Sequence, residues 1–185
     1  MHDFSVWAPD AARVEVLLPA AGAAADDAPR VEAVRAGGGW WSASVADAGH
    51  GTDYAFSLDG GPARPDPRSA WLPQGPDGPS RVFDAAAFAW TDEAWAGVDG
   101  RGAVFYELHV GTFTAEGTLD AAVGRLDHLV DLGVQVVELL PVAAFPGRWG
   151  WGYDGVGLWA VHEPYGGPEA LQRFVDACHA RGLGV

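Results

Sequence analysis

Residues 133–141 read GVQVVELLP, a run of β-branched and other apolar residues that ends in a proline. Residues 103–110, AVFYELHV, form a second, mostly apolar run. Such runs are typical of parallel strands that are buried on both faces. Between them, apolar residues recur at helical spacing behind Thr118, a suitable N-cap, and ahead of Gly133, a suitable C′ residue: Leu119, Ala122, Val123, Leu126, Leu129 and Val130. The sequence therefore predicts a strand–helix–strand unit.

The residues that follow repeat this rhythm. Pro168 suits the first turn of another helix, and Gly182 is placed to end it. The apolar stripe of that helix consists of Leu171, Phe174, Val175 and Cys178. Residues 183–185 then begin a third strand. Strands alternating with helices favour parallel βαβ units, in a doubly wound sheet or in a TIM barrel.

Neither architecture is complete within the chain, which stops as the third strand begins. Two parallel strands and a stub leave an apolar edge and one uncovered sheet face. We therefore expect residues 102–185 to be molten or aggregation-prone in isolation, whereas the N-terminal half folds.

The N-terminal half has a shorter rhythm. Alternating runs at 4–7, 13–18, 31–34, 40–45 and 53–58 are separated by turns such as Asp59-Gly60-Gly61. This pattern predicts an antiparallel β-sandwich. Residues 62–79 are rich in Pro, Gly, Asp and Arg and exclude a regular element, but Trp71 and Leu72 indicate that the stretch packs over a surface. We expect a sandwich over 1–88, a connecting segment over 89–101 and the βα part over 102–185.

Composition narrows the class of protein. The chain has 185 residues and a formal net charge of −14, which disfavours a nucleic-acid partner and a membrane partner, because both attract basic patches. No apolar run approaches the roughly 18–20 residues that span a bilayer, and the N-terminus has no signal-peptide pattern. The single cysteine, Cys178, fits a reducing compartment. We expect a cytoplasmic protein without a disulfide, and the histidines show no metal-ligand spacing.

The loop after the second βα strand is the candidate functional segment. Residues 141–155 read PVAAFPGRWGWGYDG, a long stretch rich in aromatic residues and glycine. It leaves the carboxyl end of a strand, which is where a barrel builds its active site. Aromatic rings stack on sugar rings, and a neighbouring carboxylate accepts hydroxyl hydrogen bonds. The aromatic rings and the carboxylate of this loop therefore suit a sugar as ligand.

These motifs resemble those of the α-amylase-type glycoside hydrolases. Residues 133–141 resemble the second barrel strand of that superfamily, and residues 104–113 resemble the first. Residues 151–156, WGYDGV, and 165–168, YGGP, are most similar to the malto-oligosyltrehalose trehalohydrolase branch. Glycogen branching enzymes look similar but usually have Gln at the position of Asp154. Residues 4–9 (FSVWAP), 64–69 (RPDPRS) and 78–82 (GPSRV) match the N-terminal module and its surroundings in the same way.

The resemblance implies a fold and an activity. The fold would be an immunoglobulin-like, glucan-binding β-sandwich followed by the first part of a TIM (β/α)8 barrel, truncated at the third strand. The activity would be that of a retaining hydrolase without a cofactor, which cleaves the α-1,4-glucosidic bond next to the trehalose end of maltooligosyl-trehalose or acts on another α-glucan. In the family the three catalytic carboxyl groups come from the fourth, fifth and seventh strands. No residue of 1–185 matches them, so we expect the chain to be inactive by itself.

By the same resemblance, Tyr153 forms a stacking platform for the sugar ring that is cleaved, and Asp154 orders the neighbouring loop or contacts the sugar. Two alternatives remain: a fragment of a branching enzyme, and a non-catalytic glucan-binding protein. The second would use exposed aromatics of the sandwich. Trp40 and Trp41 are adjacent in one strand and must point to opposite faces, so one of them is a candidate platform.

Other chemically capable residues have simpler interpretations. Glu107 and Glu138 lie within strands and are expected to be structural. His128 and His179 lie within helices and are expected to be solvated, and His109, at the end of the first βα strand, is expected to pack or hydrogen-bond. Cys178 falls in the apolar stripe of a helix, which indicates an inert, buried thiol.

Overall fold

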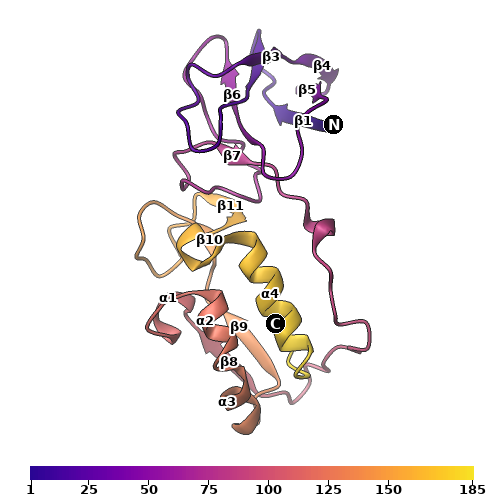
Figure 1. Ribbon diagram of the computed structural model, residues 1–185, viewed down its shortest axis with the longest axis vertical. Helices are drawn as coiled ribbons and strands as arrows, with labels where there is room; N and C mark the ends of the chain where they lie inside the picture. The colour runs from indigo at the N-terminus through magenta and orange to yellow at the C-terminus, as the bar shows by residue number, and fades with distance from the viewer.

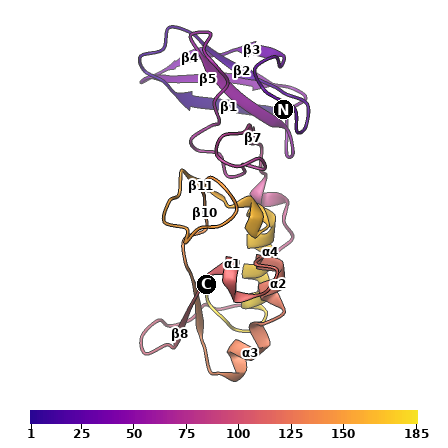
Figure 2. The same cartoon turned by 90° about the vertical axis from the view of Figure 1, so that its left-hand side faces the viewer.

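Two antiparallel sheets form the N-terminal part of the computed structural model, which describes residues 1–185. One sheet has the order β1-β5-β4, formed by β1 (His2–Trp7), β4 (Val34–Gly37) and β5 (Trp40–Val45). The other has the order β3-β2-β6-β7, formed by β2 (Val14–Leu17), β3 (Arg30–Glu32), β6 (Asp53–Leu58) and β7 (Ser80–Arg81). Figure 2 shows the strands of both sheets together at the top of the molecule.

One apolar core lies between these sheets. Alternate residues of β1 and β5 enter it from one side and residues of β2 and β6 from the other: Phe4, Val6, Trp41, Ala43, Val14, Val16, Tyr54 and Phe56. Trp41 is 6% exposed, whereas its neighbour Trp40 lies half-buried on the opposite face of β5. The predicted alternation of the tryptophan pair is confirmed, because adjacent side chains of a strand point to opposite faces.

The strand predicted at 31–34 is instead two strands in different sheets. β3 pairs with β2, and β4 pairs with β5. Between them the buried Ala33 donates its N–H to the Val14 carbonyl, and the chain passes from one sheet to the other. A run of four alternating residues carries no signal for such a change of sheet.

The C-terminal part is built on two parallel strands, β8 (Phe105–Leu108) and β9 (Val136–Leu139). A parallel bridge between Val136 and Gly184 adds the beginning of a third strand, as predicted. Its helices are α1 (Val110–Phe113), α2 (Leu119–Val123), α3 (Leu126–Asp131) and α4 (Gly167–His179). The single helix predicted between the strands is broken at Gly124, a poor helix former, where the Thr118-capped α2 ends.

The helices cover one face of this small sheet (Figure 2). Leu108 and Val137 point into the core together with helix residues such as Leu126, Leu129 and Phe174. The opposite face is open: Phe105 is 53% exposed, and Glu107 and Glu138 are exposed. Burial of the first strand on both faces was therefore a wrong prediction, whereas the expected uncovered face is present.

The loop after β9 contains an unpredicted hairpin of β10 (Ala143–Ala144) and β11 (Gly157–Val161), followed by the 3-10 turn η2 (Glu163–Tyr165). Leu72, from the irregular stretch after β6, packs on Ala144 and Ala160 of this hairpin. The prediction that residues 62–79 pack over a surface is confirmed. None of the helices has the length and apolar character needed to cross a membrane.

The 3-10 turn η1 (Ala85–Ala87) and the connecting segment after it run beside α4 (Figure 1). Thr91 binds the Asp176 carboxylate through its N–H and its hydroxyl, both at 2.8 Å. Nδ1 of His179 lies 2.6 Å from the Asp92 carboxylate, and Trp95 stacks on the His179 ring at 3.5 Å. The expectation that His179 is solvated was therefore wrong, because residues distant in sequence cover it.

Candidate functional site

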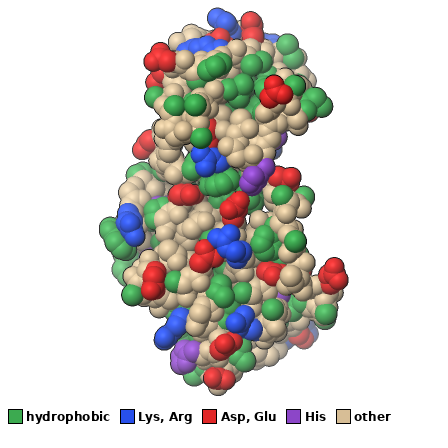
Figure 3. Space-filling view, viewed as in Figure 1, with side chains coloured by type: hydrophobic (Ala, Val, Ile, Leu, Met, Phe, Trp, Pro, Cys, Tyr) green, Lys and Arg blue, Asp and Glu red, His purple; other side chains and the backbone are tan.

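Three aromatic side chains project from the loop between β10 and β11. Trp149, Trp151 and Tyr153 are 75%, 72% and 71% exposed. Figure 3 shows hydrophobic side chains on the left edge of the molecule at the height of this loop. Tyr153 is therefore not a core residue, and the exposed Asp154 follows it directly.

The glycines between these aromatics explain why the rings face outward. A Cβ added to Gly150 would lie 2.8 Å from the Phe145 ring. Gly152 has φ of +88°, and an added Cβ would collide with the Pro141 carbonyl oxygen. Gly150 and Gly152 thus pack closely against the protein, and the neighbouring aromatic rings face solvent.

His109 fixes the loop to the end of β8. Its Nε2 lies 2.8 Å from the Gly150 carbonyl oxygen, and Nδ1 lies 3.2 Å from the Thr112 hydroxyl. Because a carbonyl oxygen only accepts, Nε2 carries the proton in this bond. The Tyr165 hydroxyl lies 3.2 Å from the same Nε2. These contacts place the aromatic loop beyond the carboxyl ends of β8 and β9, and they give His109 the hydrogen-bonding role predicted for it.

The other acidic and nucleophilic candidates are not near this loop in a catalytic arrangement. Glu107 and Glu138 lie opposite one another in the β8–β9 register, on the open sheet face. Cys178 is fully buried, and burial raises the pKa of its thiol to about 12. A thiol with this pKa stays protonated near neutral pH and is a poor nucleophile.

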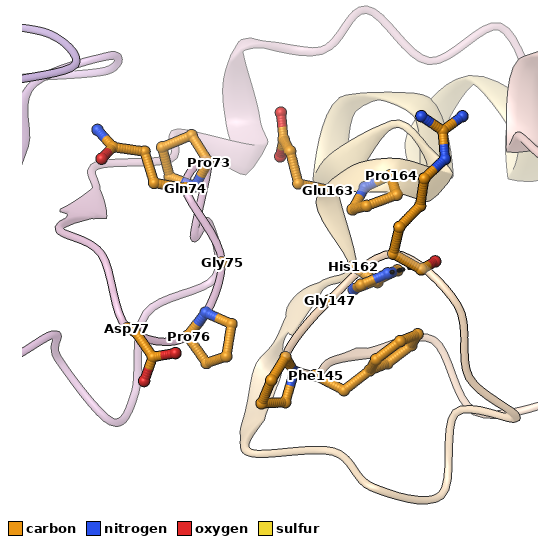
Figure 4. Close-up of a pocket in the computed structure, with 12 residues that line it drawn as sticks. Pro73, Gln74, Gly75, Pro76, Asp77, Phe145, Gly147, His162, Glu163 and Pro164 are labelled. Atoms are coloured by element: carbon orange, nitrogen blue, oxygen red, sulfur yellow. Dashed lines mark hydrogen bonds between the residues drawn. The ribbon is translucent and has the colours of Figure 1, made fainter.

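A cavity of about 520 Å³ lies where the two parts of the chain meet (Figure 4). The loop of residues 73–77 forms one wall, and residues 145–148 and 162–164 form the other. His162 is 2% exposed and stacks on Phe145 at 3.7 Å, and its burial lowers the pKa of the imidazole. Sequence analysis missed this cavity. The only sign of it in the sequence was the presence of Trp71 and Leu72 within the proline-rich residues 62–79.

Two family models match the chain. Residues 2–71 match carbohydrate-binding module 48 (isoamylase N-terminal domain), and residues 81–185 match the α-amylase catalytic domain. The second match covers more than half of the chain.

Curated relatives and a solved structure agree with these matches. The malto-oligosyltrehalose trehalohydrolases of Arthrobacter ramosus and Rhizobium sp. are 56% and 52% identical over 98% of the chain. The chain spans 31% and 30% of their lengths. The crystal structure of a putative α-amylase from Salmonella typhimurium superposes with a TM-score of 0.89 and 41% identity, over 98% of this chain and 30% of that one.

Proposed function

The chain belongs to the α-amylase family of glycoside hydrolases, and we propose on this basis that it is part of a trehalose-releasing enzyme. That enzyme would cleave the α-1,4-glucosidic bond next to the trehalose end of maltooligosyl-trehalose, with retention of configuration. The similarity to trehalohydrolases along nearly the whole chain supports this substrate. The observation that carries the proposal is the exposed aromatic loop, Trp149 to Tyr153, held beyond the carboxyl ends of parallel strands.

We propose that the N-terminal sheets form an immunoglobulin-like sandwich over residues 1–88 and that residues 102–185 are the start of a TIM barrel, with 89–101 as the connection. Shared burial of both sheets supports the first assignment. The parallel β8–β9 pair with its bridge to Gly184 supports the second.

Within this enzyme, Tyr153 would stack on the sugar ring at the cleaved bond and Asp154 would accept hydrogen bonds from its hydroxyl groups. A tyrosine ring that is 71% exposed offers a free face to a sugar. The next residue brings a carboxylate to the same turn of the loop. Asp154 also favours a trehalohydrolase over a branching enzyme, since the latter usually has Gln there.

The catalytic carboxyl groups would lie outside residues 1–185. A retaining glycosidase needs two carboxyl groups roughly 5–5.5 Å apart on either side of the scissile bond. Glu107 and Glu138 lie on a sheet face, not at the strand ends where the aromatic loop lies. We therefore propose that residues 1–185 contribute to substrate binding and do not cleave the substrate. The single cysteine fits a cytoplasmic location.

Trehalose release from maltooligosyl-trehalose tests the assignment. We expect a full-length relative to release trehalose and the 185-residue chain to release none under the same conditions. Turnover by the chain at a comparable rate would overturn the claim that it lacks the catalytic groups.

Titration with maltoheptaose, followed by tryptophan fluorescence, tests the binding role of the loop. We expect Tyr153→Ala to weaken binding roughly 2- to 10-fold, as loss of one aromatic contact does. Leu158→Ala is the control, because Leu158 is a 73% exposed residue of the same hairpin. Unchanged affinity of the tyrosine variant would refute the stacking role.

The non-catalytic alternative predicts that the sandwich aromatics bind the glucan. Of the Trp40–Trp41 pair, Trp41 is buried, so Trp40 is the member that could bind, and the Arg68 guanidinium lies 5.1 Å from its ring centroid. Loss of maltoheptaose binding in Trp40→Ala, with Tyr153→Ala unaffected, would favour this alternative.

A further inference from the structure

We propose that the cavity between residues 73–77 and the β10–β11 hairpin with η2 is a second α-glucan-binding site, separate from Tyr153. That the ligand is an α-glucan rests on the proposed function. Figure 4 shows the two walls facing one another, with Pro76 on one side and Phe145 and His162 on the other. The walls come from segments far apart in the sequence, so the site exists only when the two parts of the chain are docked.

Both walls are held in place before any ligand arrives. The Trp71 indole N–H donates to the Glu163 carboxylate at 2.9 Å and links the start of one wall to the other. The Arg81 guanidinium lies 5.0 Å from the Trp71 ring centroid and is itself bound to the buried Asp53. Leu72, 2% exposed, packs into the hairpin. A preformed site of this kind costs little ordering on binding.

The lining combines ring surfaces with hydrogen-bond acceptors. Four proline rings supply apolar patches: Pro73, Pro76, Pro146 and Pro164. Phe145 is only 3% exposed. Asp77 and Glu163 supply carboxylates. A pyranose presents the complementary chemistry, because its C–H faces are apolar and its hydroxyl groups donate. Two carboxylates against the single lining cation, Arg148, disfavour an anionic ligand.

His162 adds a polar group to the hairpin wall. Its side chain is almost fully buried, and its Nε2 lies 3.5 Å from the Arg148 carbonyl oxygen, which is at the long limit of a hydrogen bond. A sugar hydroxyl would give this nitrogen a better partner. The cavity volume of about 520 Å³ falls within the roughly 300–1,000 Å³ of small-molecule sites, so a short oligosaccharide fits.

The indole N–H signal of Trp71 in a proton–nitrogen NMR spectrum is the reporter for this site, because that group is bonded to Glu163. The signal is assigned by its loss in Trp71→Phe. On addition of maltoheptaose to the 185-residue chain we expect a saturable shift. Asp77→Ala should weaken the affinity read from this signal about tenfold, the usual effect of removing a charged hydrogen-bond acceptor. Asp131→Ala makes the same change on α3, outside the cavity, and should leave the affinity unchanged.

Tyr153→Ala separates this proposal from the previous one. We expect the Trp71 signal to respond in that variant with the wild-type affinity. A Trp71 signal that does not move in the wild-type chain, or that moves equally in the Asp77→Ala variant, overturns the second site and leaves the aromatic loop unaffected. A response that disappears in the Tyr153→Ala variant also overturns it, since the two sites would then be one.

Discussion

Substitutions of Gly152 and Gly147 measure how much the close contact between Gly152 and the Pro141 carbonyl affects the free energy of unfolding. Both have positive φ, +88° and +83°, but only Gly152 has a neighbour where a Cβ would go. Gly147→Ala should therefore cost about 1 kcal/mol of folding free energy from backbone strain alone. Gly152→Ala should cost more, because the loop must also move away from the Pro141 carbonyl. Urea unfolding of the two variants measures the difference, and equal losses would show that the contact is unimportant.

The burial of His162 predicts that the C-terminal part loses stability at acidic pH. Burial lowers the pKa of this histidine below its ordinary value of 6.5, so the unfolded chain takes up a proton at a pH where the folded chain does not. The free energy of unfolding should thus be insensitive to this residue above about pH 6.5 and fall as the pH drops from there toward the lower folded-state pKa. Urea midpoints at pH 7.5 and 5.5 measure the fall.

The matched comparison for that fall is His162→Gln, which keeps a polar side chain but does not titrate. Its midpoint should change less between the two pH values than that of the wild-type chain, whose other five histidines are shared with the variant. The same change in both proteins would remove His162 from the explanation.

Among the elements, the β8–β9 pair carries two like charges side by side. Glu107 and Glu138 are partners in the parallel register, and both are exposed on the uncovered face. Glu138→Gln should raise the free energy of unfolding by roughly 0.2–1 kcal/mol, the range of an exposed charge pair. The gain should shrink in high salt, which screens exposed charges. Glu116→Gln removes the same charge from an exposed loop position, and an equal, salt-sensitive gain there would point to net charge instead.

The sequence predicts a strand or helix well where a single local pattern of apolar residues determines it. β5 and β6 fall within the predicted bounds, because turns bracket clear runs. The helix between β8 and β9 was found but not its break, since apolar spacing continues across Gly124. The β10–β11 hairpin was missed because its strands are joined by a long glycine-rich loop. Tyr153 and Asp154 could be proposed by resemblance to a known family, whereas the cavity requires contacts between distant segments.

For the molecule as a whole, Leu72 tests how the two parts depend on one another. This residue of the proline-rich stretch is 2% exposed between Ala144 and Ala160. Leu72→Ala should cost roughly 2–5 kcal/mol, as other buried leucines do, and the loss should appear in the unfolding of the C-terminal part. Leu132→Ala is the control, since Leu132 is 60% exposed. Hydrogen exchange of both parts gives the measurement, and a loss confined to the sandwich would contradict the expected coupling.

Residues 102–185 expressed alone give the stronger form of the same test. That piece lacks Leu72 and Trp71, and it lacks the connecting segment that covers His179. We expect it to bind a hydrophobic dye and to lack dispersed NMR signals, whereas residues 1–88 alone unfold cooperatively. Cooperative, protease-resistant unfolding of the isolated C-terminal piece would contradict this.

The contacts of residues 85–95 with α4 also determine when these residues can fold during synthesis. Gln172, Asp176 and His179 of α4 hold residues 85–95, which leave the ribosome long before α4 does. The sandwich has all of its strands by Arg81 and can fold at once, but residues 85–95 have no surface to bind until α4 has emerged. Because domains fold from the N-terminus as they are made, a chaperone that recognises exposed tryptophan would find Trp95 without its His179 partner throughout that interval.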